Sequence, residues 1–333
     1  MNSFDAILFL SFGGPEGPDD VMPFLENVLR GRGVPEARKL EVAQHYLNFG
    51  GKSPINDANR DILARLRVEL DRRGIALPIY FGNRNWHPML TDTMRTMTQD
   101  GVKRALAFTT SAYSSYSSCR QYREDIARAQ AEIGAAAPTV EKLRAFFNHP
   151  RYLEAVVAHA RDAMQTVPSG SRLVFTAHSI PTSMADTCDY VAQLKETSRL
   201  VSTELGVREF DLVYQSRSGP PAVPWLEPDI LDHVRALHAR GESGVLIVPI
   251  GFVSDHMEVV YDLDHAAKDV AATLSLPFAR AKTAGTHPSF VAMICELIEE
   301  RLSGKERRSL GVLGPRNDVC ESTCCPTPAR PSR

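Results

Sequence analysis

Short apolar runs alternate with longer amphipathic stretches along almost the whole chain, and this repetition constrains the fold more than any other feature. The runs carry apolar side chains at successive positions, as in "AILFLS" and "VLIVPIGF", which is typical of strands buried on both faces. The stretches between them carry apolar residues at helical spacing. The pattern therefore predicts an α/β protein whose parallel sheets are covered by helices.

The pattern also gives approximate bounds for each element. The expected strands are Ala6–Ser11, Leu77–Gly82, Arg104–Thr110, Arg172–His178, Phe210–Gln215, Val245–Phe252 and Phe278–Lys282. The expected helices are Asp19–Leu29, Asp57–Arg73, Cys119–Ile133, Tyr152–Val167, Tyr190–Leu205, Pro228–Ala239, Met257–Leu274 and Pro288–Leu302. The stretch Glu132–Pro150 is the best candidate for a connection between two similar halves. We therefore expect two Rossmann-like lobes, residues 1–145 and 146–304, with a tail at 305–333. The last helix could pack back on the first lobe.

Composition and charge exclude several classes of protein. The formal net charge is −2 and the basic residues are scattered, so nucleic acid is not an expected partner. The first residues lack the basic region of an export signal, and no apolar stretch reaches the ~18 residues that a membrane span requires. Six cysteines among 333 residues are too few for a disulfide scaffold. We expect a cytoplasmic protein without a transmembrane segment.

Polar and aromatic residues follow several predicted strands at the point where each strand ends. His178 ends one strand, Asp255, His256 and Glu258 follow another, and "SFGGPEGP" and "TTSAYSSYSSC" follow two more. Ligands of open parallel sheets bind beyond the carboxyl ends of the strands. We therefore expect these groups to line a common crevice.

An imidazole that faces a carboxylate across a crevice can bind a divalent metal or move protons. His178 and Glu258 are the candidates, and a helix over Met257–Leu274 would place Glu258 and Asp262 on one face, as a path for cations or protons. Each group also has a simpler interpretation. His178 could be a buried histidine with satisfied hydrogen bonds, and the acidic residues could favour a helix N-terminus or form a solvated face.

Five strings, in this order along the chain, resemble the ferrochelatases, which insert ferrous iron into a porphyrin to make haem. They are "FGGKSPIN", "YFGNRNWHP", "FTAHSIP", "QSRSGPPAVPWLEP" and "PIGFVSDHMEVVYDLD". The resemblance extends to about residue 304 and implies the two-lobed chelatase fold. The variant "LSFGGPEGP" and the cysteine tail resemble the actinobacterial branch, which is similar to the coproporphyrin III ferrochelatases.

The resemblance implies a role for particular residues. His178 and Glu258 match the family's residues for iron binding and proton removal, with Asp255 and His256 beside them and Asp262 on the metal or proton path. Porphyrin contacts are implied for Ser53, Tyr122 and Phe12, and Arg30 or Arg32 is the candidate partner of a propionate. Phe12 lacks the donor atom of the tyrosine that ligates iron in some relatives, so an axial ligand at this position is not expected.

Iron insertion releases two pyrrole protons, so a base must lie against one face of the ring, and a neutral His178 can serve. The pocket must also hold the ring bent, using contacts remote from the metal. Ferrous iron and a porphyrin are therefore the expected substrates, and transient contact with neighbouring haem-pathway enzymes is left open.

The tail carries three cysteines, in "DVCESTCCPTP". Some ferrochelatases hold a 2Fe–2S cluster with one internal cysteine and three cysteines near the C-terminus. The resemblance implies Cys119, Cys320, Cys324 and Cys325 as the ligands. The alternative is a disordered tail that is prone to oxidation, and the spacing fits no standard zinc pattern.

Other functions compete with this prediction. The chain could use protoporphyrin IX as its substrate, or it could be a non-catalytic carrier of a metal or tetrapyrrole with the same fold. A cobalt or sirohydrochlorin chelatase would share the fold and a histidine pair. The strings "SDHMEVVYD" and "QSRSGPP" favour iron and a porphyrin.

Overall fold

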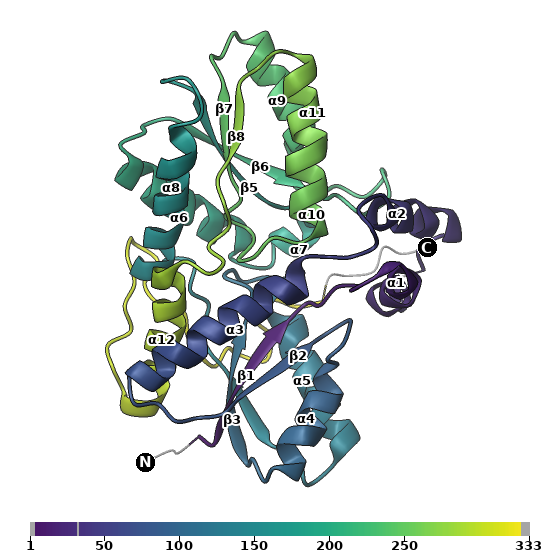
Figure 1. Ribbon diagram of the computed structural model, residues 1–333, viewed down its shortest axis with the longest axis vertical. Helices are drawn as coiled ribbons and strands as arrows, with labels where there is room; N and C mark the ends of the chain where they lie inside the picture. Colours follow the sequence, from purple (N-terminus) through teal and green to yellow (C-terminus); the bar gives the residue numbers. More distant parts are fainter. Residues whose placement is uncertain (1–3, 32, 328–333) are drawn as a thin grey trace.

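The computed structural model describes residues 4–31 and 33–327, and its framework is two four-stranded parallel sheets (Figure 1). The strands are β1 (Ala6–Ser11), β2 (Ile79–Asn83), β3 (Arg104–Thr109), β4 (Thr139–Lys142), β5 (Arg172–His178), β6 (Phe210–Gln215), β7 (Val245–Val248) and β8 (Phe278–Arg280). The first sheet has the order β2-β1-β3-β4 and the second has the order β6-β5-β7-β8. Both sheets thus have the same topology, as the prediction of two similar lobes requires.

Helices cover both sheets, and their bounds are as follows. The α-helices are α1 (Val21–Leu29), α2 (Glu36–Asn48), α3 (Ile55–Arg72), α4 (Leu90–Gln99), α5 (Gln121–Ile133), α6 (Pro150–Met164), α7 (Thr182–Ala185), α8 (Tyr190–Leu205), α9 (Ile230–Ala239), α10 (Met257–Val259), α11 (Lys268–Thr273) and α12 (Pro288–Ser303). A 3-10 helix, η1 (Pro18–Asp20), precedes α1, and two π-helices, η2 (Tyr116–Arg120) and η3 (Val260–Ala267), precede α5 and α11.

Each central strand is buried on both faces because successive side chains enter different apolar clusters. In β1, Phe9 lies in one cluster, while Leu8 lies in another with residues of α4 and α5. In β5, Phe175 belongs to the cluster that contains Phe9, whereas Val174 packs with residues of α9 and η3. The alternation follows from the two-residue period of a strand. One apolar cluster therefore runs through both sheets and joins the lobes.

The structure corrects several predicted elements. Glu132–Pro150 is not a simple connection, because its middle forms the edge strand β4. The predicted single helix Met257–Leu274 is divided into α10, the π-helix η3 and α11. Helices α2 and α4 were not predicted. The helix α12 packs against both α6 and α3, so it contacts a helix of the first lobe. The boundary at 145 and 146 stays a prediction.

The tail beyond α12 has no helix or strand in its described part, yet side chains of the body hold it in place. Asn148 is fully buried and donates hydrogen bonds to the carbonyl oxygens of Leu310 (3.1 Å) and Gly314 (2.9 Å). The buried Arg144 pairs with Glu300 at 2.7 Å and also donates to the carbonyl of Arg308. The tail is therefore ordered by contacts with other segments and not by a repeat of its own.

Candidate active site

The histidine and the carboxylate that the sequence predicts as a pair meet in the structure. His178 is the last residue of β5, and Glu258 lies in α10 after β7, the neighbour of β5 in the sheet. Their Nε2 and Oε2 atoms are 3.6 Å apart. The side chains keep 30% and 46% of their surface exposed, so the pair remains open to a ligand. Tyr190 donates a hydrogen bond to the carbonyl of His178 (3.0 Å) and supports the strand end.

The pair is charged at neutral pH, which differs from the neutral imidazole that the sequence suggested. Burial alone would lower the pKa of His178, but the Glu258 carboxylate outweighs it and raises the pKa to about 9. Burial alone would raise the pKa of Glu258, but the imidazolium outweighs that effect and lowers the pKa to about 2. Contact with the Glu258 carboxylate therefore favours the protonated form of His178.

The other ionisable residues between Asp255 and Asp262 have different environments. Burial, opposed by a hydrogen bond from Ser216, raises the pKa of Asp262 to about 6. His256 accepts a hydrogen bond from the backbone N–H of Glu258 (3.2 Å) and so caps α10, and burial lowers its pKa. Asp255 instead pairs with Arg280 at 3.1 Å and accepts from Thr283. Asp255 thus ties the loop to β8.

Three glycine-containing segments of the first lobe, "SFGGPEGP", "GGKSPIN" and "YFGNRNWHP", contact one another beside the end of β1. The side chain of Asn56 donates to the carbonyl oxygens of Gly14 (3.2 Å) and His87 (3.3 Å), and Asn83 donates to Asn56 (3.1 Å). A Cβ atom on Gly14 would lie 2.7 Å from the Cβ atom of Ser53. These contacts hold the three segments together in space, and the close approach at Gly14 leaves no room for a larger side chain.

The predicted porphyrin contacts lie in different environments. Phe12 is 36% exposed and packs edge-on against Phe24. Arg30 ends α1, is exposed, and donates to Asn27 (2.6 Å), whereas Arg32 lies outside the described residues. Ser53 and Tyr122 are buried at 2% and 4% exposure, and the guanidinium of Arg84 covers the Tyr122 ring at 4.5 Å. All of these contacts stay predictions.

Sequence reasoning missed three residues that the structure places near the pair. Gln215 and Ser216, at the end of β6, both bond Asp262. Burial and then the carboxylate of Glu258 raise the pKa of Tyr46 on α2, and its neighbour His45 stacks on Tyr261 of η3. The string "QSRSGPP" contained the signal for the first two. Tyr46 carried no signal because α2 itself was not predicted.

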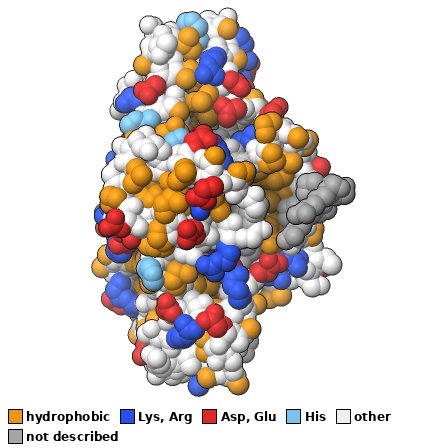
Figure 2. Space-filling view, turned by 90° about the vertical axis from the view of Figure 1, so that its right-hand side faces the viewer, with side chains coloured by type: hydrophobic (Ala, Val, Ile, Leu, Met, Phe, Trp, Pro, Cys, Tyr) orange, Lys and Arg blue, Asp and Glu red, His pale blue; other side chains and the backbone are white. Residues whose placement is uncertain are grey.

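Helix α2 reaches across to the second lobe and contacts the π-helix. The ring of His45 stacks on Tyr261 with centroids 4.2 Å apart, and Phe49 lies edge-on to His265 at 4.3 Å. The exposed Leu40 and Leu47 belong to the same helix. Figure 2 shows hydrophobic side chains gathered in the middle of this side of the molecule, between charged areas above and below. An apolar ligand bound between the lobes would therefore lie beside α2 of the first lobe and η3 of the second.

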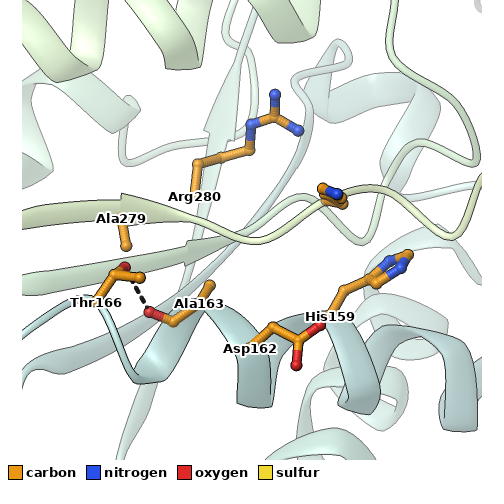
Figure 3. Close-up of a pocket in the computed structure, with 7 residues that line it drawn as sticks. His159, Asp162, Ala163, Thr166, Ala279 and Arg280 are labelled. Carbon is orange, nitrogen blue, oxygen red and sulfur yellow. Dashed lines mark hydrogen bonds between the residues drawn. The ribbon is translucent and has the colours of Figure 1, made fainter.

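Two hollows of the described structure lie away from the pair. One, of about 310 Å³, is lined by residues of α6 and β8 that include His159, Asp162 and Arg280 (Figure 3). The other, of about 410 Å³, is lined by Arg123, Lys142 and other residues of α5, β4 and the tail. Neither is lined by His178 or Glu258. The candidate active site is therefore the partly exposed His178–Glu258 pair at the strand ends, which lies outside both hollows.

The four cysteines predicted as cluster ligands gather where the tail meets η2. Arg120 holds the tail by donating to the carbonyl oxygens of Ser322 (2.6 Å) and Cys324 (3.1 Å). The Sγ atoms of Cys324 and Cys325 are 3.6 Å apart. The Cys320 thiol also lowers the pKa of the buried Cys119. Within residues 4–31 and 33–327, however, no three His, Cys, Asp or Glu side chains form a ready metal site.

A family model described as Ferrochelatase matches residues 4–302 of this chain. A ferrochelatase of Rhodopirellula baltica is 56% identical, with 98% of this chain and 95% of the relative covered. A coproporphyrin III ferrochelatase of Nocardia farcinica is 54% identical, with 98% of each covered. No helix in the described part of the chain is both long and apolar enough to cross a membrane.

Among solved structures, the chain resembles SirB of Bacillus subtilis with Fe³⁺. The TM-score is 0.57 at 13% identity, with 91% of this chain and 97% of SirB covered. The sirohydrochlorin chelatase SirB of Bacillus subtilis subspecies spizizenii, in complex with cobalt, has a TM-score of 0.55 at 12% identity, with the same shares covered. At these identities the likeness concerns the fold alone, and it agrees with the predicted chelatase fold.

Proposed function

This chain belongs to the ferrochelatase family, and from that premise we propose that it inserts ferrous iron into coproporphyrin III in haem biosynthesis, with the release of two protons. The observation that carries this proposal is the opposition of His178 and Glu258 at 3.6 Å across neighbouring strand ends. The substrate follows from the relatives named coproporphyrin III ferrochelatases, which are 54% and 52% identical.

The charges of the pair suggest how a proton leaves the porphyrin. Ferrous iron at the Glu258 carboxylate weakens the attraction between that carboxylate and His178. The pKa of the imidazole therefore falls, and His178 releases its proton to solvent. The neutral His178 then accepts one pyrrole proton, passes it to solvent, and accepts the second in the same way. Asp262, whose pKa is about 6, and His256 form the path that supplies iron or removes protons.

The first lobe holds the ring. Phe12 and the apolar side chains of α2 form one wall of the porphyrin site. Ser53 and Tyr122, which are buried, support this wall from behind. Arg30 pairs with a propionate at the exposed end of α1. Binding energy from these remote contacts bends the porphyrin, which turns the nitrogen lone pairs toward the incoming metal.

Anaerobic turnover with Fe²⁺ and excess coproporphyrin III tests the proposal. We expect many turnovers with the wild-type protein and none with His178→Ala. His238→Ala is the matched control, because this exposed histidine of α9 lies outside the proposed site. Equal turnover of the two histidine variants would remove His178 from the reaction.

The same assay separates the alternative functions. Faster turnover of protoporphyrin IX would replace the proposed substrate within the same activity. Stoichiometric binding without turnover would indicate a carrier of a metal or tetrapyrrole.

The proposal includes a 2Fe–2S cluster held by Cys119, Cys320, Cys324 and Cys325. In support, the thiols form two neighbouring pairs, Cys119 with Cys320 and Cys324 with Cys325, and a cluster of two irons needs donors around two metal positions. Lys142 and Arg123 further lower the pKa of Cys119, as suits an anionic ligand. The cluster would fix the tail to η2, which is a structural role, since iron insertion transfers no electrons.

Iron, acid-labile sulfide and visible absorption of anaerobically purified protein test the cluster. We expect both elements and a reddish-brown colour, lost in Cys320→Ser and kept in Cys295→Ser, whose thiol lies buried in α12. Colourless wild-type protein that contains neither element would reject the cluster and leave iron insertion untouched.

We place the protein in the cytoplasm, where haem-pathway enzymes could contact it transiently. The exposed Leu40 and Leu47 of α2, at 53% and 43% exposure, offer an apolar surface next to the site for such contact. Cell fractionation tests the location, and crosslinking from α2 tests the contact.

A further inference from the structure

Gln215 connects the end of β6 to the helix that carries the acidic residues. Its side chain is fully buried. Nε2 donates to the backbone carbonyl of Glu258 at 2.7 Å and to Oδ2 of Asp262 at 3.4 Å. Its Oε1 atom is buried without a hydrogen-bond partner in the described structure. A buried acceptor without a donor costs stability, so packing alone does not explain a glutamine at this position.

Ser216, the next residue, also bonds Asp262 and also carries a local cost. Its hydroxyl donates to Oδ2 of Asp262. Its φ angle is +60°, a left-handed conformation that is unfavourable for residues other than glycine. Successive side chains of an extended strand point to opposite faces. The left-handed turn at Ser216 removes this alternation, so that both side chains reach one carboxylate.

The element that these residues hold is irregular. Asp262 lies in the π-helix η3, and Glu258 lies in the single turn that precedes it. π-helices are rare, and they occur frequently at functional sites. Contacts from β6 at the carbonyl of Glu258 and at the carboxylate of Asp262 therefore fix where the first turn begins and which way both acids point.

We infer that Gln215 and Ser216 are positioning residues for the metal side of the reaction: they hold Glu258 opposite His178 and keep Asp262 beside this pair. This inference rests on the proposed function, in which the pair receives the iron. Both act through other residues, as partners behind metal ligands do, and loss of such partners typically costs about 10- to 100-fold in metal affinity or activity.

The test measures iron and porphyrin kinetics separately for Gln215→Leu and Ser216→Gly. The first variant removes the amide at similar volume, and the second removes the hydroxyl while relieving the left-handed backbone. We expect kcat/KM for Fe²⁺ to fall about 10- to 100-fold in each, while KM for the porphyrin changes less than about twofold. Thermal melting should show Ser216→Gly folded and as stable as the wild type. Ser216→Asn, which tolerates the left-handed conformation and keeps a donor, should restore part of the iron kinetics.

Gln193→Leu is the matched control. This glutamine of α8 is also fully buried and bonds Ser114 twice, at 2.8 and 3.0 Å. It should lose stability without a selective loss for iron. Unchanged iron kinetics in Ser216→Gly, or equal losses for iron and porphyrin, would overturn the inference while wild-type turnover still supports the proposed function. Absence of wild-type turnover would instead reject the proposed function.

Discussion

The two lobes use one sheet topology for different purposes. In each lobe the first strand, β1 or β5, occupies the same central position, with the second strand at the edge beside it. β1 runs into a glycine loop whose backbone packs tightly on Ser53. β5 runs into His178, which faces a carboxylate. The same strand end therefore carries a tightly packed glycine loop in the first lobe and ionisable groups in the second.

This difference shows that topology determines where a site lies, while the residues at the strand ends determine what the site does. The second lobe also contains its own contrast. At the amino end of its sheet, Arg172, Asp211 and His233 form another cluster of charges, far along the strands from His178. We expect these charges to stabilise the fold and to have no part in the reaction.

The largest expected effect comes from removing the Glu258 carboxylate, which has no counterpart at the end of β1 in the first lobe. Glu258→Gln should reduce turnover by about 10²- to 10⁴-fold and change KM for the porphyrin little. Without the carboxylate, the pKa of His178 should fall from about 9 toward or below its ordinary 6.5, so the imidazole becomes neutral at a lower pH. Steady-state kinetics and an NMR titration of the imidazole measure the two effects.

Glu242→Gln, a change at a half-buried position between α9 and β7, is the control for this experiment and should alter neither quantity. If the imidazole of His178 still titrates near pH 9 in the Glu258→Gln variant, the ion pair is not the cause of the shift.

A smaller effect is expected from filling the tight glycine contact of the first lobe. The added Cβ atom of Gly14→Ala would lie 2.7 Å from Cβ of Ser53 and 2.8 Å from Cγ2 of Ile55. Overpacking of this kind costs about 1–3 kcal/mol, and the shifted wall should raise KM for the porphyrin more than it lowers kcat. Gly17→Ala, in the same loop with no atom within 4 Å of its added Cβ, should do neither. Chemical unfolding and porphyrin titration measure both variants.

The smallest effect should come from the charges at the amino end of the second sheet. Burial raises the pKa of Asp211, but hydrogen bonds from Arg172 and His233 outweigh it, so the pKa lies below the ordinary 3.8. A depressed carboxyl contributes stability above its unfolded pKa and loses it as the pH falls through its folded pKa. Asp211→Asn should therefore cost about 1 kcal/mol at pH 7.

Unfolding at several pH values checks this expectation. The difference between Asp211→Asn and the wild type should shrink as the pH falls below about 4, because the wild-type carboxyl then becomes protonated as well. Iron insertion should remain unchanged. A loss of turnover comparable to that of Glu258→Gln would end the distinction between the two ends of the sheet.

Sequence patterns predicted three strands to the residue, and they predicted the irregular elements worst. β1, β5 and β6 have the predicted bounds, because each is a short, mainly apolar run followed closely by glycine or polar residues. The central strand β7 ends at Val248, four residues before the predicted Phe252. The helix α8 also has its predicted bounds, with Gly206 in a left-handed conformation after its end. The edge strand β4 was missed because its residues are only half-buried, so no apolar run marked it.

Some features of the candidate site could likewise be predicted from the sequence, and others could not. The sequence by itself determined the alternating α/β plan, the two sheets and the position of His178 and Glu258 at strand ends, because side-chain periodicity and strand polarity are local properties. Only the tertiary structure decided that the pair is charged, that η3 is a π-helix, and that Gln215 and Ser216 hold Asp262 from another strand. These features depend on distances between segments remote in the chain, and on the burial that such packing produces, which no local pattern contains.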